Sequence, residues 1–173
     1  VFNEVANFAS KENLTLCVAM RNSSGSAVFD EKKYYTHSNN DRVEFIPRNH
    51  FSSYSAAQSS RLIITLSSTL GYEMLGMGER VIFAKDINQL SSHVLKGVWT
   101  ANLVTHRLPN LQRLFSTRDG EFSEKANFLL DMADEDYLQY SEEARQYYMN
   151  FDKNNLPQDI VKNKIAKLLD SQG

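Results

Sequence analysis

The chain has 173 residues, enough for one domain or for one part of a larger enzyme. Apolar residues make up 42% and charged residues 23%, which is ordinary globular composition and excludes a disordered or collagen-like chain. The net charge of −2 does not favour a nucleic acid as partner. No apolar run approaches the roughly 20 residues of a membrane-spanning helix. The single cysteine, Cys17, excludes an intramolecular disulfide framework and a cysteine-rich zinc site.

The chain starts at Val1-Phe2-Asn3, with no initiator Met and no signal-peptide pattern. We therefore expect a domain taken from a longer protein. A lone cysteine is typical of proteins that fold in a reducing compartment. The expected location is the cytoplasm, with peripheral attachment to the inner face of the membrane left open.

The first half of the chain alternates between strand-like and helix-like patterns. Nearly continuous apolar runs predict buried strands, at Leu14–Met20, Val43–Ile46, Leu62–Leu66 and Val81–Ala84. Helical spacing and Ser caps predict short helices around them, at Phe2–Ser10, Asp30–Tyr35, Ser52–Ser59 and Thr69–Met77. Gly78 follows the last of these, where a helix commonly ends in a left-handed residue.

From about Asn110 onward the pattern is helical, with apolar stripes at Phe122–Leu130, Tyr137–Phe151 and Ile160–Leu169. Alternating strands and helices predict an α/β fold with a parallel sheet of at least four strands and helices on both faces. A helical C-terminal segment should fold back over the sheet. Residues 1–173 are expected to form a single domain, with the α/β core at about 10–109 and the C-terminal helices at about 110–173.

The most informative stretch, residues 67–78, lies between the third and fourth predicted strands. A buried strand ends there in small hydroxyl residues, Ser67, Ser68 and Thr69, and a helix begins. The first N–H groups of a helix lack partners inside it, and its dipole adds partial positive charge at the same point. Gly71 would let a ligand approach the backbone closely. These features predict an anion site at the carboxyl edge of a parallel sheet.

Glu73 lies one turn into the same helix. A carboxylate there stands clear of a phosphate at the helix start and can accept hydrogen bonds from sugar hydroxyls. Hydrogen-bond donors for phosphate, next to a carboxylate that can bind ribose, predict a nucleoside-diphosphate site. A second interpretation stays open, because Ser-Ser-Thr before a helix is also a good N-cap. In that case the negative charge of Glu73 would only interact favourably with the positive end of the helix dipole.

Four runs around this stretch carry a family resemblance: Ser53–Ser55, Ser59–Thr65, Ser67–Glu73 and Gly78–Phe83. They resemble the C-terminal half of two-domain glycosyltransferases of the GT-B fold, in particular those of bacterial surface-carbohydrate and polysaccharide synthesis. The family carries a Ser-Thr-(Leu/Val)-Gly-x-Glu-x-x-x-x-Gly motif. The matching residues are Ser68, Thr69, Leu70, Gly71, Glu73 and Gly78. The resemblance covers about residues 10–85 and departs at Glu79-Arg80, where the family has Pro or Lys followed by Pro.

The resemblance implies a Rossmann-like domain that binds a nucleotide-sugar. Ser68, Thr69 and the Gly71 backbone would hold the donor diphosphate, and Glu73 would hold the ribose hydroxyls. Residues from Ile46 to Arg48 would border the base. The residues expected to bind the nucleotide-sugar are Arg21, Ile46, Ser67, Ser68, Thr69, Leu70, Gly71 and Glu73.

Three of the candidate residues have open alternatives. Arg21 ends the first predicted strand, where a guanidinium can clamp a phosphate or can simply be a surface charge. His50 and His93 are candidates for contact with the donor sugar, and each can equally be an ordinary loop histidine.

No metal and no cofactor is expected. The four histidines lack metal-ligand spacing, and Asp134-Glu135-Asp136 opens a predicted helix, where acids favour the positive helix end. Cys17 lies inside a predicted buried strand and is expected in the core. Four tyrosines at helical spacing are expected to pack on the sheet or on another domain: Tyr137, Tyr140, Tyr147 and Tyr148.

We expect the chain to be the donor-binding domain of a glycosyltransferase in surface-polysaccharide synthesis. The enzyme would move a sugar from a nucleotide-sugar to a glycan or lipid-linked acceptor, with electrostatic stabilisation of the leaving diphosphate. A missing N-terminal domain would supply the catalytic base, so the isolated chain should bind nucleotide without turnover. Two alternatives stay open: half of a sugar-nucleotide 2-epimerase, and a non-catalytic α/β module for protein association.

Overall fold

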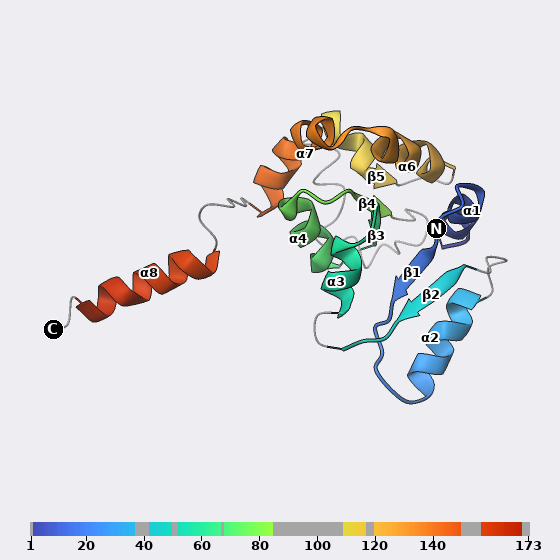
Figure 1. Cartoon of the computed structure of the whole chain (residues 1–173), viewed down its shortest axis with the longest axis horizontal. Coiled ribbons are helices and arrows are strands. Elements are labelled where there is room, and N and C mark those ends of the chain that lie inside the picture. Colours follow the sequence, from blue (N-terminus) through green and yellow to red (C-terminus); the bar gives the residue numbers. More distant parts are fainter. Residues whose placement is uncertain are drawn as a thin grey trace, which may run out of the picture.

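The computed structural model describes residues 2–36, 42–49, 52–66, 68–84, 109–116, 120–149 and 157–170. The α-helices are α1 (Phe2–Lys11), α2 (Ser26–Thr36), α3 (Ser52–Gln58), α4 (Thr69–Met77), α6 (Phe122–Asp131), α7 (Asp134–Met149) and α8 (Pro157–Asp170). The strands are β1 (Leu16–Ala19), β2 (Val43–Ile46), β3 (Ile63–Thr65), β4 (Val81–Ala84) and β5 (Phe115–Ser116); a 3-10 helix, η2 (Pro109–Leu114), precedes β5. Helices and strands alternate from α1 to β4, which confirms the predicted α/β fold class (Figure 1).

All strand pairs in the described ranges are parallel. β1 pairs with β2, and β4 lies between β3 and β5 in a second sheet. The prediction of one sheet with at least four strands is therefore wrong for the part of the chain that the structure describes. A run of apolar residues predicts the burial of a strand but not the strand that lies beside it. Helix α3 links the two sheets, because it contacts β1, β2 and α4.

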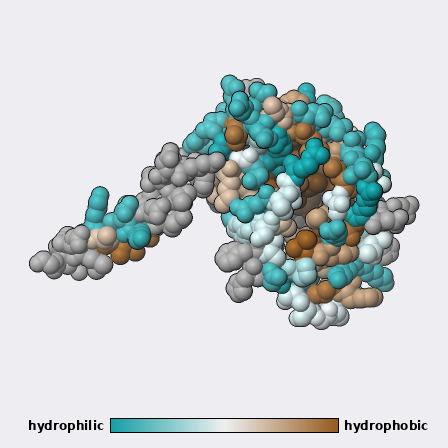
Figure 2. Space-filling view, viewed as in Figure 1, coloured by the Kyte–Doolittle hydropathy of each residue, from teal (hydrophilic) through white to brown (hydrophobic). Residues whose placement is uncertain are grey.

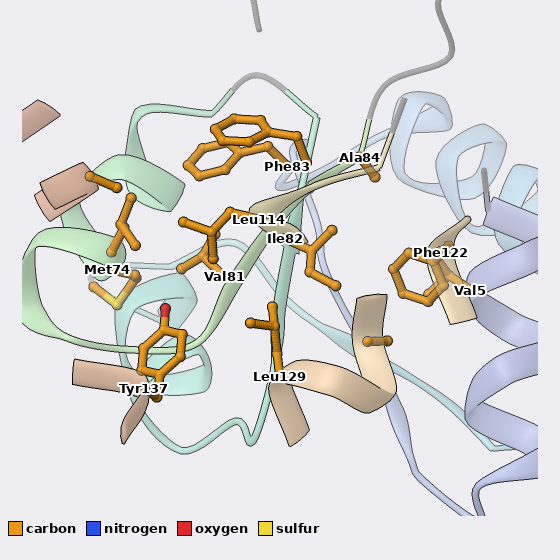
Figure 3. Close-up of a cluster of buried hydrophobic side chains, with 14 of the residues drawn as sticks. Val5, Met74, Val81, Ile82, Phe83, Ala84, Leu114, Phe122, Leu129 and Tyr137 are labelled. Carbon is orange, nitrogen blue, oxygen red and sulfur yellow. The ribbon is translucent and has the colours of Figure 1, made fainter. Parts of the chain in front are cut away.

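The main core surrounds β4. All four residues of this strand are buried, with Val81 and Ile82 at 0% exposure. Helix α4 packs on the sheet through Met74 and Leu75, which are equally buried. The helices α6 and α7 add Phe122, Leu129 and Tyr137 to the same cluster (Figure 3). Helix α4, which forms most of residues 67–78, and the strand β4 after it are thus stabilised by the main hydrophobic core.

The tyrosines of α7 pack largely as predicted. Tyr137 is 1% exposed, and its hydroxyl donates a hydrogen bond to the Glu79 carbonyl oxygen at 2.6 Å. Burial raises the pKa of Tyr137 to about 12, so the hydroxyl keeps its proton at neutral pH. Tyr148 stacks on Tyr72 of α4, with ring centroids 5.0 Å apart. Only Tyr147 among the four lies mainly outside, at 44% exposure.

The segment before α6 contains a strand that the sequence pattern did not predict. β5 has two residues, Phe115 and Ser116, and both are buried against β4. The prediction that the chain is helical from about Asn110 onward is wrong here. Two residues are too few to show either alternation or helical spacing, so periodicity could not detect this strand.

The β1–β2 sheet is much less buried than predicted. Within β1 only Val18 is buried. Cys17 is exposed, so its predicted place in the core is wrong. β1 has a partner strand on one side, and the helix that follows it, α2, contributes no buried residue. An apolar run can therefore form a strand whose second face remains in contact with solvent.

Helix α4 begins and ends at the predicted residues. Its last turn closes on Gly78, which has φ +93°, the left-handed conformation that favours glycine. The Gly78 N–H donates to the Leu75 carbonyl and the Glu79 N–H donates to the Met74 carbonyl, both at 3.0 Å. These two bonds form a Schellman motif, which satisfies carbonyls that the helix end leaves unpaired.

Helix α8 lies apart from the body of the molecule (Figure 1). Residues 161–167 are all exposed, and hydrophilic and apolar side chains lie on opposite sides of the helix (Figure 2). Among the described helices, none has both the length and the apolar character that a membrane crossing requires.

Candidate functional site

The candidate site is centred on the turn from β3 into α4. Ser68 is the N-cap residue, with extended backbone at φ −72° and ψ 137°. The Leu70 N–H donates to Ser68 Oγ at 3.3 Å, and the Ser68 N–H donates to Thr65 Oγ1 at 3.2 Å. The capping role of Ser68 is therefore confirmed. Thr65, at the end of β3, fixes the direction in which the chain leaves the strand.

The start of α4 is open to solvent. Ser68 and Thr69 are exposed, and Leu70 is half-buried. The Gly71 N–H already donates to the Ser68 carbonyl at 3.1 Å. Within the described residues, no hydrogen bond engages the Thr69 N–H. An anion at this helix start would therefore meet one amide donor, two hydroxyl groups and the positive end of the helix dipole.

Gly71 faces the sheet. A Cβ at this position would collide with the Thr65 Cγ2 methyl and lie 3.3 Å from Phe83 Cε1. The helix can therefore start directly over the end of β3 only because residue 71 has no side chain. The sequence motif suggested this glycine for a close approach by a ligand. In the structure, the feature that demands glycine is the contact between helix and strand, and the ligand contact stays a prediction.

Glu73 lies one turn into α4, where it is half-buried. The Tyr54 hydroxyl of α3 donates a hydrogen bond to Glu73 Oε2. Among the described residues, no donor contacts the second carboxylate oxygen, Oε1. The hydrogen bond to Glu73 raises the pKa of Tyr54, so the tyrosine stays a donor at neutral pH. The carboxylate is thereby held by one partner and can accept further hydrogen bonds.

A second group of charges lies at the carboxyl ends of β1 and β2. Arg21 is exposed and follows β1. Arg48 follows β2 and donates from Nη1 to the Arg21 carbonyl at 2.8 Å. Glu31 of α2 accepts hydrogen bonds from the backbone N–H groups of Arg21 and Asn22, at 2.8 and 3.0 Å. The loop after β1 is thus tied both to β2 and to α2, with two guanidinium groups and one carboxylate around it.

The predicted binding residues fall into two groups in the structure. Ser68, Thr69, Leu70, Gly71 and Glu73 share the first turns of α4 and the cap before it. Arg21 and Ile46 lie at the ends of β1 and β2, with the Ile46 carbonyl accepting from the Met20 N–H at 3.0 Å. No hydrogen bond or ion pair joins the second group to α4 within the described ranges. Ser67, His50 and His93 lie outside the described residues.

Two residues of these groups had no role assigned from the sequence. Tyr54 lies in a run that carries the family resemblance, but its contact with Glu73 spans 19 positions in the chain. Glu31 shows no sequence signal at all, because a carboxylate on an exposed helix is common. Arg48 stood only at the border of the expected base site.

The acidic triplet 134–136 lies in the first turn of α7, as predicted. Asp134 pairs with Arg80, with 2.7 Å between Oδ1 and Nη1. Within the part of the chain that the structure describes, no three His, Cys, Asp or Glu side chains are grouped as metal ligands would be.

The comparison with known protein families gives a match over residues 1–164. The matching family, Lept_O_ant_chp1, is described as "putative O-antigen biosynthesis protein". The chain belongs to this family. No curated protein and no solved structure matches the chain. The family thus connects the chain with surface-carbohydrate biosynthesis, in agreement with the coarser part of the sequence-based expectation.

Proposed function

We propose that the chain binds the nucleotide-sugar donor of a glycosyltransferase that acts in O-antigen synthesis. The observation that carries this proposal is the start of α4. An exposed, Ser68-capped helix N-terminus follows the parallel strand β3, whose last residue, Thr65, is buried, and the Glu73 carboxylate lies one turn further along the same helix. The family description supports the carbohydrate context.

In this proposal the diphosphate of the donor lies against the start of α4. The Thr69 N–H and the Ser68 and Thr69 hydroxyls would donate to its oxygens, and the helix dipole would favour its charge. As the sugar departs to the acceptor, negative charge grows on the leaving nucleoside diphosphate. Donors that are already oriented toward this charge lower the barrier to transfer.

Glu73 would bind the ribose rather than the phosphates. One helical turn separates it from the start of α4, about 5.4 Å along the axis. This spacing keeps the carboxylate off the diphosphate, where like charges would repel. Ribose hydroxyls are hydrogen-bond donors, and an ionised carboxylate is a strong acceptor for them.

Arg21 and Arg48 would add positive charge at the ends of β1 and β2, and Ile46 would border the base. The Arg48 contact with the Arg21 carbonyl ties the loop after β1 to the end of β2. Glu31 lies beside Arg21 and offsets part of the positive charge. We therefore assign the main diphosphate contact to α4 and a supporting contact to the arginines. The acceptor, a glycan or a lipid-linked sugar, would approach from the side of the donor sugar.

A thermal-shift screen of the chain against UDP, GDP, CMP, ADP and TDP tests this proposal. A ligand that binds only the folded state adds about 2.7 kcal/mol of stability at a hundred times its Kd. We expect one of these nucleotides to raise the Tm. The Glu73→Gln variant should show a smaller rise at the same nucleotide concentration, because an amide is a weaker acceptor for the ribose hydroxyls.

Glu143→Gln is the matched control, since Glu143 is an exposed helical carboxylate on α7. It should respond to nucleotide as the wild type does. No Tm rise with any nucleotide, together with a concentration-dependent dimer, would favour the association module. Conversion between epimeric sugar-nucleotides without an acceptor would instead favour the epimerase.

A further inference from the structure

Tyr54 connects the two helices that flank the candidate site. It lies in the middle of α3, and its hydroxyl reaches Glu73 of α4. The Tyr54 side chain also packs against the main hydrophobic core. The ring is therefore packed on the core at one side while its hydroxyl reaches Glu73.

The contact leaves the carboxylate able to bind more donors. An ionised carboxylate has about four acceptor positions on its two oxygens. Tyr54 takes one of these positions, on Oε2. A glutamate side chain without a hydrogen-bond partner samples more rotamers, and each binding event must then fix one of them. A partner that holds the rotamer beforehand removes that cost from binding.

We propose that Tyr54 is a positioning residue that holds the Glu73 carboxylate for the ribose hydroxyls of the donor nucleotide. This inference rests on the proposed function and goes beyond it, because it assigns a new residue and a selectivity. Recognition of ribose over deoxyribose should depend on Tyr54, whereas binding of the diphosphate at the start of α4 should not.

The alternative is that the contact only ties α3 to α4. Tyr137 offers a matched comparison for this alternative. Its hydroxyl also donates a hydrogen bond, but to the Glu79 carbonyl after α4, and its ring belongs to the α7 contact with the core. Tyr54→Phe and Tyr137→Phe each remove one hydroxyl and the hydrogen bond that it donates. Only the first should change how the protein discriminates between sugars.

The test uses isothermal titration with the nucleoside diphosphate that stabilises the chain, and with its 2′-deoxy and 3′-deoxy analogues. A hydrogen bond between a neutral hydroxyl and a charged carboxylate corresponds to about a tenfold preference for the ribonucleotide in the wild type. Tyr54→Phe should lower this preference to about threefold or less, with the affinity for the deoxy analogue nearly unchanged. Tyr137→Phe should keep the wild-type preference.

Glu73→Asp provides a second variant should Tyr54→Phe fail to fold. It keeps the charge but withdraws the carboxylate from both the Tyr54 hydroxyl and the ribose, so it should lose the preference while the diphosphate still binds. Three results would separate the possible failures. Unchanged ribose preference in Tyr54→Phe would overturn the role of Tyr54 alone, and unchanged preference in Glu73→Asp would overturn the ribose contact that both roles share. No binding of any nucleoside diphosphate by the wild type would overturn the proposed function and the role of Tyr54 together.

Discussion

The β3–α4–β4 unit and the β1–α2–β2 unit have the same order of strand, helix and strand, but they differ sharply in burial. In the first unit all of β4 is buried, and α4 buries four residues. In the second unit the strands bury only Val18, α2 buries none, and Met20 just after β1 is the other buried side chain among its described residues. The first unit is covered by α7, which contacts α4, whereas the second is reached chiefly through α3.

This difference shows how the candidate site is supported. The start of α4 is exposed, but the strand before it and the remainder of the helix belong to a dense core. Donor groups on such a base keep their positions when a ligand arrives, which favours binding by preorganisation. The arginine group at the ends of β1 and β2 relies instead on the loop contacts of Arg48 and Glu31. We expect the first group to determine affinity and the second to adjust it.

The largest expected effect is on the free energy of unfolding, when an apolar side chain is truncated in each of the two units. Ile82→Ala removes a side chain with 0% exposure, so it should lower the free energy of unfolding by about 2–5 kcal/mol. Phe29→Ala on α2 removes a ring that is 69% exposed and should change it by less than about 0.5 kcal/mol. Urea unfolding of both variants measures the two changes. Similar losses would mean that the two units are buried alike.

The next effect concerns the contact between α4 and β3. Alanine normally stabilises an exposed helix relative to glycine by about 1 kcal/mol. Gly71→Ala should instead destabilise by about 1–3 kcal/mol, because its Cβ would collide with the Thr65 methyl. Thr65→Ser removes that methyl and keeps the hydroxyl oxygen that accepts the hydrogen bond from the Ser68 N–H.

The double variant Gly71→Ala/Thr65→Ser should therefore be more stable than Gly71→Ala alone, and a double-mutant cycle in urea measures this coupling. Strictly additive effects of the two substitutions would contradict the packing role of Gly71.

The smallest effect lies in the loop after β1. Desolvation opposes ionisation of Glu31, but the backbone N–H groups of Arg21 and Asn22, the Asn22 amide and the Arg21 charge together lower the pKa of this carboxyl below its ordinary 4.5. A group with a lowered pKa in the folded state stabilises the protein above its unfolded pKa. This stability is lost as the pH falls through the folded value.

The Tm of Glu31→Gln should therefore lie slightly below that of the wild type at pH 7, and the gap should close as the pH falls below the ordinary Glu range. Melting curves at several pH values measure the gap. A gap that stays constant down to the lowest pH would show that the carboxylate charge does not hold this loop.

The parts of the fold that local signals determine could be predicted from the sequence. The bounds of α4 and β4 were predicted at the observed residues, because a Ser cap, a left-handed Gly78 and a short apolar run act within a few positions. The bounds of β1 were too wide by several residues, and Cys17 was misplaced. Its neighbours are apolar, but burial of a strand depends on what covers it, and no local pattern contains that information.

The candidate site was only partly predictable for the same reason. The motif placed Ser68, Gly71 and Glu73 on one strand–turn–helix unit, and the structure has that unit. It could not show that Gly71 faces Thr65, nor that Tyr54 reaches Glu73 from another helix. Both are contacts between elements that the chain brings together only on folding.

The most direct test of the central claim is a two-dimensional amide NMR spectrum of the ¹⁵N-labelled chain with the nucleoside diphosphate that it binds. If the diphosphate lies at the start of α4, the Thr69 and Leu70 amide signals should shift the most. Those shifts should persist in Tyr54→Phe, which keeps the diphosphate contacts. Shifts confined to residues away from α4, or no shift at saturating nucleotide, would contradict a donor site at this helix.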